Sequence, residues 1–411
     1  MNSTIAISAN TQHYLELEEK YGAHNYHPLP VVLNRGEGVF LYDVDGKRYY
    51  DFLSGYSAVN QGHCHPKIIA TLIEQAQKLT LTSRAFHSNL LGEYEKYITE
   101  YFGYDKVLPM NTGVEAVETA IKLCRKWAYE VKGIPEGQAK LIVCDGNFHG
   151  RTVNVISFSS DPTAKNNFGP FVPGYISIPH NDLPALEKAL QDEHVAAFLF
   201  EPIQGEAGVV VPDEGYFKSV RDLCTEYDVL MVADEIQTGL ARTGKMLACD
   251  HEDVRPDIVI LGKALSGGVL PVSAVLCDDE VMMTIKPGEH GSTYGGNPLA
   301  CAVAITALQV LKDENLAANA EAMGNLLRNE LEKLNSPFIS IVRGKGLLNA
   351  IVIKHTNPDA AWELCLALKE NGLLAKPTHG DKIRFAPPLV INKEQVMECV
   401  EIIATCLKQL I

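Results

Sequence analysis

The feature that most constrains the fold is a series of short apolar runs in the middle of the chain, separated by segments with helical character. The expected strands are Lys106–Met110, Leu141–Cys144, Val195–Glu201, Val229–Asp234, Asp257–Gly262 and Val272–Cys277. Helices are expected at Thr112–Glu130 and near Tyr216–Tyr227. Strands that are apolar throughout are typical of a sheet buried on both faces. We therefore predict an α/β fold with a mostly parallel sheet covered by helices, whose ligands bind beyond the carboxyl ends of the strands.

In the last third of the chain this pattern changes. A long helical stretch, Pro298–Leu334, precedes short strands, and a final helix begins at Lys393. The short strands are expected at Ile339–Val342, Leu348–Ile353 and Lys382–Phe385. This mixture indicates a smaller α+β domain. We predict a large domain over residues 50–296 and a small domain formed by residues 1–49 and 297–411.

Composition and charge exclude several classes of protein. The chain has 411 residues and a formal net charge of −15, which disfavours binding to nucleic acid or to anionic lipid. No apolar run approaches the roughly 18 residues that span a bilayer. No Lys or Arg precedes Lys20, and the ten cysteines form no Cys-x-x-Cys pair. We therefore expect no signal peptide or presequence, reduced thiols and a cytoplasmic location, with neither a membrane nor a nucleic acid as partner.

One segment imitates the phosphate loop of nucleotide-binding proteins. Gly239–Lys245 has the spacing of that motif, but Met246 stands where a Ser or Thr would bind magnesium. No strand runs directly into Gly239, and no helix is expected after Lys245. An ATPase or GTPase is therefore disfavoured.

The sequence His63-Cys64-His65 resembles a metal-binding cluster. Three consecutive side chains do not converge easily on one ion, and no second cluster offers the remaining ligands. The flanking Gly62 and Pro66 favour a turn instead. We therefore predict no metal site.

Two strand ends carry more specific chemistry. Asp234 ends one apolar strand, and Lys263 follows the next strand along the chain. A partly desolvated lysine loses its proton more easily and can form a Schiff base with a carbonyl. Without other evidence, Lys263 would be interpreted as an ordinary surface lysine at the end of a strand. Together with an acid that faces a ring nitrogen, it has the arrangement that pyridoxal phosphate requires.

Two loops are suited to hold the phosphate of such a cofactor. Asn111–Glu115 lies between a strand and a helix, and its Thr112-x-x-Glu115 pattern predicts a capping box. A helix start of this kind offers free N–H groups to an anion. Gly291–Gly296 is a second loop with hydroxyls and glycines.

These motifs together resemble the class III pyridoxal-phosphate aminotransferases. The motifs, in order, are Asn111–Ala116, Phe148–Thr152, Ala233–Gly239, Leu261–Lys263 and Gly291–Thr293. The resemblance extends from about Tyr21 to the C-terminus and implies the pyridoxal-phosphate-dependent transferase fold type I. Within the family, the chain is most similar to members that act on ornithine. Three segments carry that similarity: Tyr21–Pro30, Glu201–Gly208 and His379–Pro388.

The resemblance implies a role for each residue of the cofactor site. Lys263 would bind the cofactor covalently and later shuttle a proton, and Asp234 would keep the ring nitrogen protonated. Phe148 would stack on the ring, and Gln237 would bond its phenolic oxygen. The remaining cofactor-binding residues would be Gly113, Val114 and Ile236, joined by Ser292 and Thr293 from a neighbouring subunit. That last role implies a homodimer with shared active sites, with a higher oligomer left open.

The resemblance also implies how substrates are selected. Arg151 and Tyr26 would bind the α-carboxylate of ornithine, which leaves its δ-amine facing the cofactor. Glu206 would mask Arg384 by pairing with it, and would release it to bind a carboxylate of 2-oxoglutarate. Tyr56 would favour ornithine by contacting it near its α-amino group.

The implied activity is transfer of the δ-amino group of L-ornithine to 2-oxoglutarate, giving L-glutamate 5-semialdehyde and L-glutamate. An acetylornithine or 4-aminobutyrate aminotransferase of the same family is the alternative, and a non-catalytic cofactor-binding regulator is a remote one. The chain departs from the family pattern at two places. His149 replaces a Trp of some relatives, and Val117 replaces a Gly; neither is expected to touch an assigned catalytic role.

Overall fold

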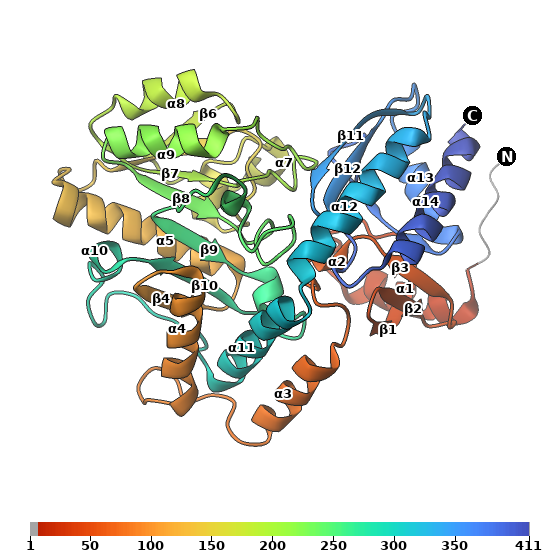
Figure 1. Cartoon of the computed structure of the whole chain (residues 1–411), viewed down its shortest axis with the longest axis horizontal. Helices are drawn as coiled ribbons and strands as arrows, with labels where there is room; N and C mark the ends of the chain where they lie inside the picture. The colour runs from red at the N-terminus through yellow and green to blue at the C-terminus, as the bar shows by residue number, and fades with distance from the viewer. Residues whose placement is uncertain (1–6, 411) are drawn as a thin grey trace.

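The computed structural model describes residues 7–410 and contains a seven-stranded sheet in the middle of the chain (Figure 1). The spatial order is β4 (Lys106–Met110), β10 (Ser273–Cys277), β9 (Ile258–Leu261), β8 (Leu230–Asp234), β7 (Val195–Phe200), β5 (Lys140–Cys144) and β6 (Tyr175–Ile178). Every pair is parallel except the two made by β10, which runs antiparallel to β4 and β9. The predicted mostly parallel sheet is confirmed. The edge strand β6 was not predicted.

Helices cover both faces of this sheet. Leu141 and Val143 of β5 pack in one core cluster with α5 (Gly113–Trp127). Ile142 and Cys144 point to the opposite face and pack with α8 (Leu183–Leu190) and α9 (Tyr216–Glu226). Because alternate side chains enter two different cores, all four of these positions have to be apolar.

The long helical stretch near residue 300 is two helices. α11 (Pro298–Asp313) and α12 (Leu316–Lys333) are separated at Asn315, whose φ of +53° is incompatible with a continuous right-handed helix. α12 leads into a four-stranded sheet. Its order is β11 (Ile339–Lys345), β12 (Leu348–Ile353), β15 (Lys382–Phe385) and β14 (Lys376–Thr378). The smaller α+β part of the predicted fold is therefore present.

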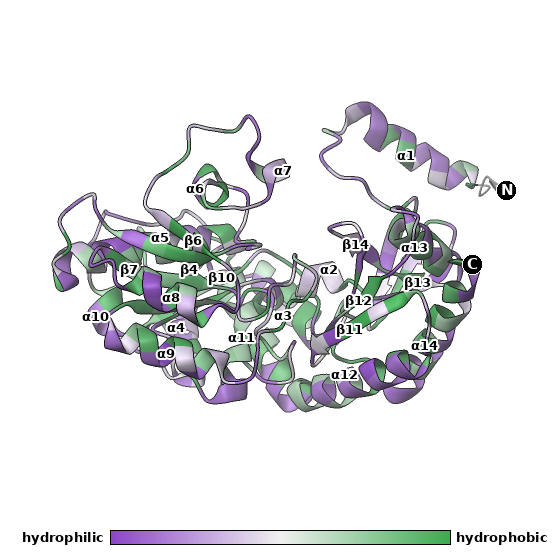
Figure 2. Ribbon diagram, turned by 90° about the horizontal axis from the view of Figure 1, so that it is seen from above, coloured by the Kyte–Doolittle hydropathy of each residue, from purple (hydrophilic) through white to green (hydrophobic). Residues whose placement is uncertain are grey.

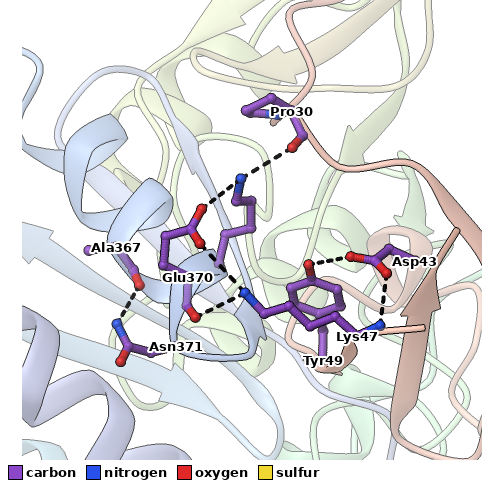
Figure 3. Close-up of polar contacts among 8 residues, drawn as sticks. Pro30, Asp43, Lys47, Tyr49, Ala367, Glu370 and Asn371 are labelled. Atoms are coloured by element: carbon purple, nitrogen blue, oxygen red, sulfur yellow. Dashed lines mark hydrogen bonds and ion pairs between the residues drawn. The ribbon is translucent and has the colours of Figure 1, made fainter. Parts of the chain in front are cut away.

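N-terminal strands join this C-terminal part. A second four-stranded sheet has the order β1 (Leu33–Glu37), β2 (Phe40–Asp43), β3 (Arg48–Asp51) and β13 (Leu373–Leu374). Lys47 reinforces the junction, since its ammonium donates to the carbonyl of Glu370, 3.0 Å away, and lies 3.6 Å from the Glu370 carboxylate (Figure 3). The domain boundaries at 49/50 and 296/297 stay a prediction, and residues 1–6 and 411 of the predicted small domain lie outside the described residues.

The remaining elements are helices. The helices are α1 (Ala9–Tyr21), α3 (Pro66–Ala76), α4 (Asn89–Phe102), α6 (Val153–Ser157), α7 (Pro162–Lys165), α10 (Asp279–Met282), α13 (Ala360–Glu370) and α14 (Lys393–Leu407), with a four-residue turn, α2 (Ser54–Ser57). Figure 2 shows α1, α6 and α7 projecting on the same side of the molecule. Among residues 7–410, no helix has the length and apolar character to cross a bilayer.

The structure explains the two segments that imitate other motifs, Gly239–Lys245 and His63–His65. Arg242, inside the segment that imitates a phosphate loop, is fully buried and donates to Asn60 and to the carbonyls of Leu347 and Pro387. This segment therefore ties the two parts of the chain together. In the apparent metal cluster, His63 pairs with Asp51 and His65 with Glu314, so the two rings serve different carboxylates.

Candidate active site

The carboxyl ends of the parallel strands bring the predicted cofactor residues to one edge of the large sheet. Asp234 is the last residue of β8, and Lys263 lies two residues beyond the end of β9. Both line a cavity of about 200 Å³. The other predicted cofactor residues that line it are Gly113, Val114, Phe148, Ile236 and Gln237.

Lys263 is held in an unusual backbone conformation. Its φ is +42°, in a region that residues other than glycine seldom occupy. Burial lowers the pKa of its amine to about 8, although the nearby Glu206 carboxylate acts in the opposite direction. The amine is therefore much easier to deprotonate than that of an ordinary lysine.

Asp234 is paired with His149, and both residues line this cavity. The His149 Nδ1 lies 2.6 Å from one carboxylate oxygen of Asp234, and the backbone N–H of Ile236 donates to the other oxygen at 3.1 Å. Burial alone would lower the pKa of His149, but the hydrogen bond and the charge of Asp234 outweigh it and raise that pKa. The expectation that His149 touches no assigned role is therefore wrong. Val117, the other departure, is a buried core residue.

Glu201 is a residue of this cavity that the motif analysis left without a role. It directly follows β7, as Asp234 ends β8, so the same argument from strand ends applies to it. One oxygen of Glu201 accepts the backbone N–H of Phe148 at 2.9 Å. Burial raises the pKa of its carboxyl to about 7.

An anion-binding helix start opens onto the same cavity. Thr112 caps α5 in a capping box, in which its N–H donates to Glu115 at 2.7 Å and its hydroxyl accepts the N–H of Glu115. Helix geometry leaves the N–H groups of Gly113 and Val114 without partners inside the helix. A Cβ on Gly113 would lie 3.0 Å from the Ile236 side chain, so glycine provides the room here.

Ser292 and Thr293 lie outside this cavity within their own chain. The Ser292 hydroxyl accepts a hydrogen bond from the Asn111 side chain at 2.8 Å, and Thr293 is exposed. Neither residue is among those that line the cavity. A single chain therefore does not bring these two hydroxyls to the predicted cofactor position.

Close to Lys263, the partly exposed Glu206 forms an ion pair with the buried Arg384. A nitrogen of the guanidinium lies 2.6 Å from a Glu206 oxygen, and the Tyr56 ring lies 4.9 Å from the guanidinium carbon. Burial acts to raise the pKa of Glu206, but Arg384 outweighs burial and holds that pKa below its usual value. The Thr378 hydroxyl donates to the backbone carbonyl of Glu206 at 2.7 Å, a contact that the sequence motifs did not reveal.

A second cavity of about 310 Å³ shares Phe148, His149 and Gly150 with the first. Arg151 and Glu206 line this second cavity, and the Arg151 guanidinium lies 5.6 Å from the Phe148 ring centre. Tyr26 is 70% exposed on the segment between α1 and β1. The predicted carboxylate-binding pair is thus only partly assembled in one chain.

Several buried polar atoms point to a missing polar ligand. Among the described residues, Gln237 Oε1, His149 Nε2 and Arg384 Nε are buried and have no hydrogen-bond partner. Unpaired buried polar atoms are uncommon in folded proteins and call for a partner. A reactive amine, a paired carboxylate and an anion-binding helix start surround the same space, so these residues fit pyridoxal phosphate.

Comparison with known proteins identifies the family. Residues 21–407 match the family model described as "Aminotransferase class-III". A relative from Rattus norvegicus, named "Ornithine aminotransferase, mitochondrial", is 66% identical over 96% of this chain and 90% of its own length. The crystal structure of the ornithine aminotransferase from Toxoplasma gondii ME49 superimposes with a TM-score of 0.95 at 50% identity, over 97% of this chain and 95% of that one. The acetylornithine aminotransferase from Elizabethkingia anophelis gives a TM-score of 0.90 at 60% identity, over 98% and 100%.

The expectation of a cytoplasmic location is wrong by the same comparison. Relatives from rat, Drosophila melanogaster and Caenorhabditis elegans, 66%, 65% and 61% identical, are all named mitochondrial. The absence of Lys and Arg before Lys20 therefore does not decide the compartment. The predicted fold class, in contrast, is confirmed by the solved structures. Because the family model and these relatives match nearly its whole length, the chain belongs to the class-III aminotransferase family.

Proposed function

We propose that this chain transfers the δ-amino group of L-ornithine to 2-oxoglutarate, using pyridoxal phosphate. The observation that carries the proposal is the ion pair between Glu206 and the buried Arg384, 2.6 Å apart, next to Lys263 and Tyr56. A carboxylate-binding arginine that is masked by a glutamate suits an enzyme that binds an amino donor and an amino acceptor in turn. The names of the rat and Toxoplasma relatives support the same activity.

The cofactor would be held from three directions. The N–H groups of Gly113 and Val114 would bind its phosphate, Phe148 would cover its ring, and Asp234 would face the ring nitrogen. Bound pyridoxal phosphate supplies an aldehyde that reacts with amines and a ring that accepts electron density. The 2.6 Å contact with His149 fixes the orientation of the Asp234 carboxylate.

Lys263 would carry the proton during the reaction. Because burial lowers its pKa to about 8, a substantial fraction of the amine is neutral near physiological pH. A neutral amine can accept a proton from one atom of the bound reactants and donate it to another. Its conformation with φ of +42° fixes the start of the side chain at the cavity wall.

Substrate selection would depend on which partner Arg384 has. With ornithine bound, Glu206 would stay on Arg384, while Arg151 and Tyr26 would hold the α-carboxylate. With 2-oxoglutarate bound, Glu206 would move away and Arg384 would bind a carboxylate. Bidentate pairing of a guanidinium with a carboxylate makes the exchange selective.

A homodimer would complete the site. Ser292 and Thr293 lie outside the cavity of their own chain, and Thr293 is exposed. We propose that they reach the phosphate of a neighbouring subunit, with residues 50–296 forming the cofactor domain of each chain. Tyr26 is also exposed, and residues of the neighbouring subunit would surround it in the same dimer.

Acetylornithine is the second candidate substrate. It is favoured by the Elizabethkingia anophelis enzyme, which is 60% identical and is named as an acetylornithine aminotransferase. Acetylation removes the positive charge of the α-amine and adds bulk at that position. Tyr56, which contacts Arg384 at the inner end of the site, argues for the free amine.

The first prediction separates these substrates. The purified holoenzyme with 2-oxoglutarate should show kcat/KM for L-ornithine about 100-fold higher, or more, than for N-acetylornithine or 4-aminobutyrate. Parallel assays of glutamate formation measure this ratio. A higher kcat/KM for N-acetylornithine would replace the proposed substrate and keep the family.

The second prediction concerns the pH dependence of cofactor capture. Only a neutral amine attacks an aldehyde, so covalent capture of pyridoxal phosphate by the apoprotein should accelerate as pH rises through about 8, the pKa of Lys263. Borohydride trapping followed by mass spectrometry at each pH measures the rate. Lys263→Ala should trap no cofactor, whereas Lys393→Ala, at the exposed start of α14, should behave as wild type. A midpoint near 10.5, the value of an ordinary lysine, would contradict the role of burial.

The third prediction concerns masking of Arg384. Glu206→Gln removes the charge that pairs with Arg384, so an amino-donor carboxylate should bind there more easily. We expect the ratio of kcat/KM for L-glutamate over that for L-ornithine to rise about tenfold or more. Glu214→Gln changes an exposed carboxylate that lines neither active-site cavity and should leave the ratio unchanged. The same ratio in Glu206→Gln and wild type would refute masking.

A further inference from the structure

Tyr56 stands on a left-handed helical turn, a conformation that L residues disfavour. The four consecutive residues of α2, Ser54 to Ser57, have φ values of 51°, 54°, 60° and 71°. Only Gly55 is a glycine, so three of these four consecutive residues occupy the left-handed region with a side chain. Such a turn persists only where its surroundings hold it, and segments of this kind occur mainly at functional sites.

Asp51 holds the start of this turn. One oxygen of its buried carboxylate accepts the backbone N–H groups of Leu53 and Ser54, both at 2.8 Å. The other oxygen lies 2.7 Å from His63 Nε2, which orients the carboxylate. Asp51 itself ends β3 and is fixed by the sheet. The turn therefore begins from a rigid anchor.

Ser54 connects the turn to the strand that carries Arg384. The fully buried Ser54 hydroxyl donates to the carbonyl of Ala386 at 2.7 Å. The N–H of Ala386 in turn donates to the carbonyl of Phe52 at 2.8 Å. Ala386 directly follows β15, two residues after Arg384. These two bonds therefore fix the spacing between the turn and the strand.

Tyr56 is the residue that this spacing places. Its ring lies 4.9 Å from the Arg384 guanidinium carbon, close enough for a cation–π contact. A relaxed, right-handed turn would direct the Tyr56 side chain elsewhere, because inverting φ at four residues redirects every Cα–Cβ bond of the segment. Asp51 and Ser54 oppose that relaxation without lining either active-site cavity.

We propose that Asp51 and Ser54 are positioning residues for substrate selection, which hold the left-handed turn so that the Tyr56 ring stays against Arg384. The inference rests on the proposed function, in which Tyr56 favours ornithine and Arg384 binds a carboxylate. It adds to the residues that determine selectivity two that line neither active-site cavity and act through Tyr56.

The test is a double-mutant cycle on substrate selectivity. In Ser54→Ala, the ratio of kcat/KM for L-ornithine over that for 4-aminobutyrate should fall about tenfold, chiefly through a higher KM for ornithine. Tyr56→Leu should lower the same ratio, and Ser54→Ala should lower it no further in the Tyr56→Leu background.

The controls separate positioning from a general structural effect. Ser219→Ala removes a comparable hydroxyl, which donates to the Gly215 carbonyl in α9, and should leave the ratio unchanged. Asp51→Asn keeps an acceptor but loses the charge, and should lower the ratio with the affinity for pyridoxal phosphate unchanged. Equal losses from Ser54→Ala in both the wild-type and Tyr56→Leu backgrounds, or an unchanged ratio, would overturn the inference. A wild-type enzyme without ornithine activity would instead overturn the proposed function.

Discussion

Three charged groups of the site lie within, or directly after, buried strands that have a neighbouring strand on each side. Asp234 ends β8, Glu201 follows β7 and Arg384 lies within β15, so none of them can move far to find water. Each therefore has to be paired inside the protein, because an isolated buried charge is very costly. His149 pairs with Asp234, a backbone N–H binds Glu201, and Glu206 pairs with Arg384. The chemistry of the site depends on which of these pairs a ligand can open by replacing one member.

The Glu206–Arg384 pair is the exchangeable one. A carboxylate substrate can replace Glu206 on Arg384 because both offer the guanidinium the same planar partner. In contrast, Asp234 is fixed by contacts on both oxygens, from His149 and from the Ile236 N–H. The site therefore combines one rigid acid, one amine with a lowered pKa and one pair that responds to the substrate. This combination suits a reaction in which two different molecules use the same cofactor in turn.

The sequence revealed those parts of the site that local patterns determine. Apolar runs located β8 and β9, so the neighbouring positions of Asp234 and Lys263 could be predicted from the order of strands. The break at Asn315 escaped notice, because the residues on both sides favour helix and only the φ of +53° interrupts it. The antiparallel direction of β10 was equally hidden, since strand sequence does not reveal direction.

Features that arise from tertiary contacts could not be predicted in this way. His149 was expected to touch no assigned catalytic role, but its Nδ1 contacts Asp234, which is 85 positions away in the sequence. The left-handed turn at Tyr56 depends on Ser54 and Ala386, which are 332 positions apart. Such pairs join elements whose proximity is known only once the sheets are assembled. Family motifs locate the reacting groups, whereas the residues that hold them in place become visible only in three dimensions.

The most direct test of the proposed chemistry is the visible absorption spectrum of the purified holoenzyme, recorded with L-ornithine and no amino acceptor. The account predicts that the band of the bound cofactor disappears as it is converted to its amine form, and returns when 2-oxoglutarate is added. Both halves of the exchange would then be seen on one sample. A band that L-ornithine leaves unchanged, but that N-acetylornithine or 4-aminobutyrate removes, would contradict the assignment of ornithine as the amino donor.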